Sequence, residues 1–150
     1  MRHNAPVFTL RPLAPSPQLA TLLANCGLPV SDISAGETSL FVGAFVGKDL
    51  AGTVGLQLYP PAALLRSLAV SPSHRGHGVG VTLVRHAEAL AAERGVDTLY
   101  LLTTSAAPFF AKEGYEVVPR SAAPQAIQTT TQFSGLCPAT STCMAKRLNA

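Results

Sequence analysis

The residues with the clearest chemical meaning form a glycine-rich turn between a predicted strand and a predicted helix. Gly76, Gly78 and Gly80 carry no Cβ, so the backbone there can adopt a positive φ and approach a ligand closely. The first amides of the following helix have no partner within the helix, and the helix end carries partial positive charge. Arg75 adds a cation and Thr82 adds a hydroxyl. Together they predict an anion site that suits a phosphate group.

The spacing of this turn excludes two common phosphate-binding motifs. The P-loop needs a Gly-Lys-Ser/Thr sequence, which does not follow here. The dinucleotide fingerprint needs Gly-x-Gly-x-x-Gly in a βαβ unit, whereas these glycines alternate and follow a predicted antiparallel meander. A different kind of nucleotide-binding module and a plain helix start with a flexible entry remain open from the residues alone.

A second chemical signal is a single arginine in an otherwise apolar strand. A guanidinium is costly to bury without a partner, so Arg66 has one of two roles. It clamps the carboxylate or a similar oxyanion of a substrate through paired hydrogen bonds, with Ser67 beside it. Alternatively it forms a structural salt bridge or lies at an exposed edge.

Histidines and cysteines give weaker signals. His74 and His77 contact phosphate or face solvent as ordinary turn residues. The three cysteines, Cys26, Cys137 and Cys143, are an odd number without zinc spacing, which predicts reduced thiols and no metal site. Cys137 and Cys143 could bind trivalent arsenic, a soft ion that suits thiolates, or pack in the core.

The elements that must position these residues follow from hydrophobic periodicity and turn signals. Ser16 and Pro17 predict a helix start, and Gly27 predicts its end. A long helix begins after the glycine turn and ends near Gly95, and its core stripe comprises Val79, Leu83, Val84, Ala87 and Leu90. Ser105 is expected to cap a short helix that Gly114 ends. Predicted strands cover 7–10, 40–46, 50–59, 64–70, 97–103, 115–118 and 141–148, the fifth of them buried on both faces.

Composition limits the classes of protein that the chain can represent. Its 150 residues are 47% hydrophobic and 13% charged, which suits one folded domain over residues 1–150 and argues against disorder. The net charge of +3 has no basic cluster, so nucleic acid is not an expected partner, although a small anion is. The sequence has neither a signal-peptide pattern nor an apolar run of membrane-spanning length. We therefore expect a cytoplasmic α+β domain with a mixed sheet that makes no membrane contact.

The glycine turn resembles a motif of the Gcn5-related N-acetyltransferase (GNAT) superfamily. Arg75, Gly78 and Gly80 satisfy its Arg/Gln-x-x-Gly-x-Gly/Ala pattern, and residues 109–115 resemble its aromatic-x-x-x-Gly-aromatic segment. The resemblance implies a mostly antiparallel mixed sheet, flanked by helices, whose fourth and fifth strands splay apart. It also implies acetyl-coenzyme A (acetyl-CoA) as donor, held by these residues: Leu68, Ala69, Val70, Arg75, Gly76, His77, Gly78, Val79, Gly80, Thr82, Phe109, Phe110 and Lys112.

A narrower resemblance concerns residues 64–70, 101–104 and 133–144. These segments resemble N-acetyltransferases associated with arsenic-resistance operons, which in turn resemble amino-acid (glutamate) N-acetyltransferases. The resemblance implies a small, anionic, amino-acid-like acceptor or an arsenical analogue of one. The alternative is a catalytically weak CoA-binding or metalloid-sensing module. A homodimer is a further expectation, because small domains with open sheet edges often pair.

Acetyl transfer needs an oxyanion donor and groups that move protons. The backbone N–H of Leu68 is a candidate oxyanion donor. Many family members have Glu on the fourth strand, where this sequence has Arg66 and Ser67, and often have Tyr at the position of Phe110, which cannot donate a proton. The hydroxyls of Thr103 and Thr104 are therefore the candidate proton relays. Packing is the expected role of two tyrosines, Tyr59 and Tyr115.

Overall fold

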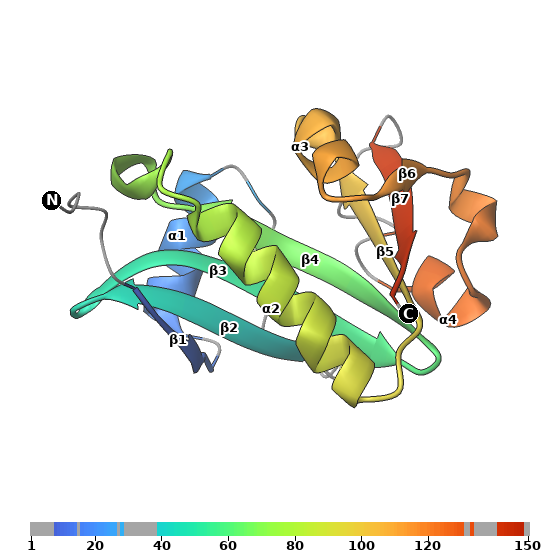
Figure 1. Ribbon diagram of the computed structural model, residues 1–150, viewed down its shortest axis with the longest axis horizontal. Coiled ribbons are helices and arrows are strands. Elements are labelled where there is room, and N and C mark those ends of the chain that lie inside the picture. The colour runs from blue at the N-terminus through green and yellow to red at the C-terminus, as the bar shows by residue number, and fades with distance from the viewer. Residues whose placement is uncertain are drawn as a thin grey trace, which may run out of the picture. The chain divides into compact units, whose positions relative to one another are not determined.

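A computed structural model of the chain describes residues 8–14, 16–26, 28, 39–130, 133 and 141–148. Its strands form one sheet in the order β1-β2-β3-β4-β5-β7-β6. The β4–β5 pair is parallel, and the β1–β2, β5–β7 and β6–β7 pairs are antiparallel. The mixed sheet predicted from the sequence is therefore confirmed, with helices flanking it (Figure 1).

The elements follow one another in the order that the periodicity predicted. The strands are β1 (Thr9–Pro12), β2 (Ser39–Val46), β3 (Asp49–Tyr59), β4 (Ala62–Val70), β5 (Thr98–Thr103), β6 (Glu116–Val117) and β7 (Thr142–Arg147). The α-helices are α1 (Pro17–Asn25), α2 (Val79–Glu93), α3 (Ala107–Lys112) and α4 (Gln125–Gln128), and two short 3₁₀ turns are η1 (Pro72–His74) and η2 (Arg120–Ala122).

The chain divides into two compact units. Unit 1 comprises Met1–Gly55 and Ser67–Ala87, and unit 2 comprises Leu56–Arg66 and Glu88–Ala150. Three elements, β3, β4 and α2, each contribute residues to both units.

In unit 1, the sheet lies between α1 and the first half of α2 (Figure 1). Ser16 caps α1 as predicted, because its hydroxyl accepts a hydrogen bond from the Leu19 N–H at 3.2 Å. The buried side chains of α1 pack against Phe41 and Ala69. On α2, Val79 lies so close to β3 that a Cβ on Gly52 would meet its Cγ1 at 2.9 Å. This glycine therefore permits the close approach of helix and strand.

In unit 2, β5 pairs with β7 over six residues, from Thr98 with Arg147 to Thr103 with Thr142. Its parallel pairing with β4 covers only three residues of each strand, Ala62–Leu64 and Thr98–Tyr100. A second apolar cluster joins β4, α4 and β7, and consists of Ala62, Leu64, Ala123, Ile127, Phe133 and Cys143.

Several sequence expectations need correction. The strand predicted at 7–10 is shifted to Thr9–Pro12, and Val7 lies outside the described residues. Buried and half-buried residues alternate along β5 rather than all being buried, because a strand shows its side chains to the two faces in turn. In the core stripe of α2, Leu90 is only half-buried, because the buried face continues from Ala87 to Ala91, four residues further along the helix. Gly27 lies outside the described residues.

Candidate functional site

The segment after β4 forms an open loop around two glycines with left-handed backbone. Gly76 has φ +85° and Gly78 has φ +80°, and a Cβ on either would meet no atom within 4 Å. Gly80 lies in the first turn of α2, so the positive φ expected for the glycines applies to Gly76 and Gly78. The strand-to-helix connection thus exposes backbone at its surface.

The amides at the start of α2 are available to an anion. The first helical hydrogen bond runs from the Thr82 N–H to the Gly78 carbonyl at 3.1 Å, so the amides of residues 78–81 precede the helical ladder. Gly78 stands where a capping side chain would normally accept a hydrogen bond from one of these amides, and glycine has no side chain to do so. Positive partial charge and unpaired donors therefore coincide at this loop.

Arg75 is held against the end of β4. Its Nε donates to the Val70 carbonyl at 3.1 Å, and its Nη2 lies 3.7 Å from the Cys26 Sγ. The Cys26 thiol donates to the same Val70 carbonyl at 3.6 Å. Two donors therefore occupy this carbonyl, so any contribution of Val70 to ligand binding has to come from its N–H. This structural use of Arg75 and Cys26 was not predicted from the sequence, because Cys26 lies 49 residues before Arg75 in the chain.

The middle of β4 combines a buried cation with an unusual backbone. Arg66 is only 4% exposed, so the alternative of an exposed edge position is wrong, and the residue has an interaction within the protein. Ser67 follows it with φ +57°, a left-handed conformation that costs a residue with a Cβ about 1–2 kcal/mol. Such a distortion re-aims neighbouring side chains and main-chain groups. Leu68 is half-buried and Ala69 is buried.

The two threonines at the end of β5 have different surroundings. The Thr103 hydroxyl accepts a hydrogen bond from the Ala106 N–H at 2.9 Å, whereas Thr104 is exposed. The structure also corrects the expected helix start, because α3 has Ala106 at its N-cap and no side-chain capping bond. Thr103 supports this turn three residues ahead of Ala106, in place of the predicted Ser105.

Three aromatic rings anchor α3. Phe110 is buried and makes edge-to-face contacts with Phe109 and Tyr115, with ring centroids 5.1 and 5.4 Å apart. Phe109 is half-buried and Lys112 is exposed. The packing role expected for Tyr115 is confirmed on its ring side. Gly114 ends the helix with φ +97°, as the sequence predicted.

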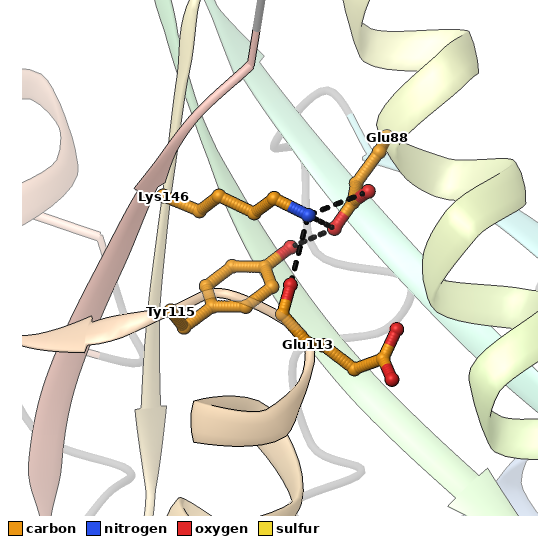
Figure 2. Close-up of polar contacts among 4 residues, drawn as sticks. All are labelled: Glu88, Glu113, Tyr115 and Lys146. Carbon is orange, nitrogen blue, oxygen red and sulfur yellow. Dashed lines mark hydrogen bonds and ion pairs between the residues drawn. The ribbon is translucent and has the colours of Figure 1, made fainter.

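Unit 2 contains a polar cluster that the sequence did not predict, which Figure 2 shows. The Lys146 Nζ lies 3.1 Å from both carboxylate oxygens of Glu88 and donates to the Glu113 carbonyl at 2.8 Å. The Tyr115 hydroxyl donates to Glu88 Oε2 at 2.9 Å. Burial raises the pKa of Tyr115 far above its usual value, and the negative charge of Glu88 raises it further. Glu88 and Lys146 are 58 residues apart in the chain, so no local spacing in the sequence predicts this cluster.

The two cysteines that the structure describes give no sign of a metal centre. Cys26 and Cys143 are both free thiols, and Cys137 lies outside the described residues. Burial raises the pKa of the Cys143 thiol, while Arg120 opposes this in part, so the thiolate form that binds arsenic is disfavoured. Within the described part of the chain, no group of three metal-ligating side chains occurs. The helices described there also lack the length and apolar character needed to cross a membrane.

The predicted site residues fall into two groups. The last residues of β4 and the glycine loop lie in unit 1, where the Arg75 side chain donates a hydrogen bond to the Val70 carbonyl. Arg66, the β5 threonines and the α3 residues lie in unit 2. His74 is half-buried and His77 exposed, and the His77 Nδ1 lies 3.3 Å from the His74 carbonyl.

Comparison with known sequences places this geometry in context. Residues 12–115 match the profile described as Acetyltransferase (GNAT) family. The chain is 31% identical over 104 residues to the streptothricin acetyltransferase of Streptomyces lavendulae, a match that covers 65% of this chain and 55% of that protein. The matched region thus spans about half the length of this curated relative.

Solved structures show the same fold. The N-acetylglutamate synthase from Neisseria gonorrhoeae, complexed with coenzyme A and N-acetyl-glutamate, aligns with a TM-score of 0.78 at 21% identity. This alignment covers 96% of the present chain and 36% of the synthase. The PaiA N-acetyltransferase from Thermoplasma acidophilum, in complex with coenzyme A, aligns with a TM-score of 0.68 at 16% identity, covering 95% and 99% of the two chains.

Proposed function

The chain belongs to the GNAT acetyltransferase family, and we propose that it transfers the acetyl group of acetyl-CoA to the amine of a small, anionic, amino-acid-like acceptor. The observation that carries the donor assignment is the loop between β4 and α2. Its left-handed glycines, Gly76 and Gly78, are open to a ligand, and the helix amides behind them precede the first helical bond. This arrangement suits the diphosphate of CoA, and two fold relatives were crystallised with coenzyme A.

In this proposal the donor-binding residues divide by the part of CoA that they meet. The amides of residues 75–80 bind the diphosphate, with Thr82 nearby. Main-chain groups of Leu68, Ala69 and the Val70 N–H bind the amide-bearing pantetheine arm. Phe109, Phe110 and Lys112 of α3 complete the donor site, where the burial of Phe110 makes its role one of supporting the helix.

The proposed reaction needs little from side chains once the donor and acceptor are positioned. The nitrogen of a neutral amine forms a bond to the thioester carbon, the carbon–sulfur bond breaks, and the amine loses a proton while the thiolate gains one. The Leu68 N–H is proposed to stabilise the oxyanion. Thr103 and Thr104 are proposed as proton relays toward water, because neither Glu on β4 nor Tyr at position 110 is present. The Thr103 hydroxyl keeps its proton to donate while it accepts from Ala106.

The acceptor assignment depends on Arg66. Its buried guanidinium is suited to a carboxylate or a similar oxyanion, to which it can present two parallel N–H groups. The synthase that shares the fold was crystallised with N-acetyl-glutamate, which supports an anionic acceptor. A link to arsenic resistance through an arsenical analogue is part of the same proposal, as are a cytoplasmic location and a homodimer.

We also propose that residues 1–150 act as one domain, since β3, β4 and α2 pass through both compact units. A second candidate function is a CoA-binding or metalloid-sensing module with little turnover. The specific observation in its favour is the absence of the usual base and acid, because the fourth strand has Arg66 and Ser67 where Glu is common, and Phe110 stands where Tyr is common.

A thiol-release assay tests the proposed function. The purified chain is given acetyl-CoA with amino acids, phosphonate and arsenical analogues, and streptothricin, and free CoA thiol is measured. An anionic amino acid or its analogue is expected to release thiol. Turnover with streptothricin alone would contradict the anionic acceptor, and CoA binding without any turnover would favour the sensing module.

A further inference from the structure

Three segments of unit 1 meet at the carbonyl that ends β4. Cys26 is the C-cap of α1, and its thiol donates to the Val70 carbonyl at 3.6 Å. Arg75, at the entrance of the glycine loop, donates to the same oxygen through Nε at 3.1 Å. Its Nη2 lies 3.7 Å from the Cys26 Sγ, so the three groups form a closed set of contacts.

The donor and acceptor capacities of these groups match. A carbonyl oxygen has two lone pairs, and here each receives one donor. A thiol can donate its proton to the carbonyl while its sulfur accepts from the guanidinium. The guanidinium uses two of its five N–H groups in this arrangement and therefore faces the protein on that side.

The loop that follows needs an anchor of this kind. Gly76 and Gly78 make its backbone permissive, and a Cβ there would meet open space, so packing around these glycines does not fix the loop. An amide cradle binds an anion well only when its N–H groups are already oriented. The contacts of Arg75 fix the residue immediately before the first of these glycines.

We propose that Arg75 and Cys26 are positioning residues, which hold the donor loop to the end of β4 and to α1, and that the Arg75 side chain acts on the donor through the loop. This inference rests on the proposed function. The Arg/Gln-x-x-Gly-x-Gly/Ala pattern agrees with this positioning role. Arg and Gln side chains both donate hydrogen bonds but only Arg is charged, so the property they share is the hydrogen bond. Through Leu19, Leu22 and Leu23, which pack on Phe41 and Ala69, the position of α1 then also influences donor binding.

Calorimetric titration with CoA and with pantetheine, which lacks the diphosphate, tests the proposal on the full chain. Arg75→Ala is expected to raise the Kd for CoA about tenfold, whereas Arg75→Gln, which can still donate to Val70, stays within about threefold of wild type. Cys26→Ala is expected to raise it about threefold, and Cys26→Ser restores most of the affinity. Pantetheine binding is expected to stay unchanged, as is CoA binding by Arg94→Gln, an exposed arginine on the same chain.

The outcomes separate this inference from the proposed function. If the effects of Cys26→Ala and Arg75→Ala are less than additive in the double variant, the two residues act as one anchor. Equal losses in Arg75→Gln and Arg75→Ala would overturn the proposal, because the charge would then contact phosphate directly. If the effects of the two single variants on the Kd for CoA are additive, or if Cys26→Ala binds CoA with wild-type affinity, Cys26 is not part of the anchor. A wild-type chain that binds no CoA would instead refute the proposed function itself.

Discussion

Arg66 brings a guanidinium into the buried part of β4, where only 4% of it is exposed. If it binds the acceptor's oxyanion, Arg66→Ala should raise the acceptor KM at least about tenfold, because a hydrogen bond to a charged group contributes about 1.5–3 kcal/mol. The Kd for CoA should stay within about twofold. Arg66→Lys keeps the charge but loses the paired hydrogen-bond geometry, so its acceptor KM should lie between those of wild type and Arg66→Ala. Steady-state kinetics and calorimetry check this, and equal loss of donor and acceptor binding would make Arg66 a structural residue.

Tyr115 gives a prediction about pH because its hydroxyl is buried against Glu88. Burial and the nearby carboxylate raise the pKa of Tyr115 above the unfolded value of about 10. Above pH 10 the unfolded chain releases this proton and the folded chain keeps it, so the free energy of unfolding should fall by about 1.4 kcal/mol per pH unit. This contribution to stability is fully present below pH 10.

Tyr115→Phe isolates that effect. The variant loses the hydrogen bond to Glu88 and should be less stable than wild type by about 1–2 kcal/mol at neutral pH. Urea denaturation between pH 8 and about 11 should show the two stabilities converging above pH 10, because only wild type loses stability through this group. Parallel pH curves for the two proteins would show that the tyrosine ionises equally in both states.

At the scale of elements, α3 starts with support from β5. The Thr103 hydroxyl receives the Ala106 N–H at 2.9 Å, in a helix whose N-cap has no side-chain bond of its own. Thr103→Val should therefore lower the free energy of unfolding by about 1 kcal/mol, and Thr103→Ser should restore it. Thr104→Val, at an exposed neighbour, is the matched control and should change stability by less than about 0.5 kcal/mol. Equal stabilities of the two valine variants in denaturation would contradict this role of Thr103.

Elements with strong local signals could be predicted from the sequence, and those that depend on distant partners could not. Ser16 with Pro17, and Gly95 and Gly114 with positive φ, mark helix ends through chemistry within one turn. The support of Ala106 by Thr103 comes from the preceding strand, whereas the local sequence pattern points to Ser105. In the candidate site, the open glycines were predictable because their geometry is local. The contact of Arg75 with Cys26 was not, since the two residues are 49 positions apart and only the fold brings them together.

At the scale of the whole molecule, the chain carries a net charge of +3, and its proposed donor carries several phosphate charges. Electrostatic attraction of this kind weakens with ionic strength. The KM for acetyl-CoA should therefore rise at least about threefold between about 50 and 300 mM NaCl. The KM for S-acetyl-pantetheine, which has no phosphate, should stay nearly constant over the same range. If the KM values for both donors rise equally with salt, the rise does not come from attraction of the phosphates and this prediction is wrong.

The central claim concerns the loop between β4 and α2, and calorimetric binding of CoA and pantetheine tests it most directly. Gly47 and Gly78 form a matched pair, because both have positive φ and open space where a Cβ would lie, so alanine at either should cost about 1–2 kcal/mol of stability. Wild type should bind CoA at least about tenfold more tightly than pantetheine. Gly78→Ala should remove most of that difference, and Gly47→Ala should preserve it. Equal affinity of wild type for the two ligands, or equal behaviour of the two glycine variants, would contradict a diphosphate cradle at this loop.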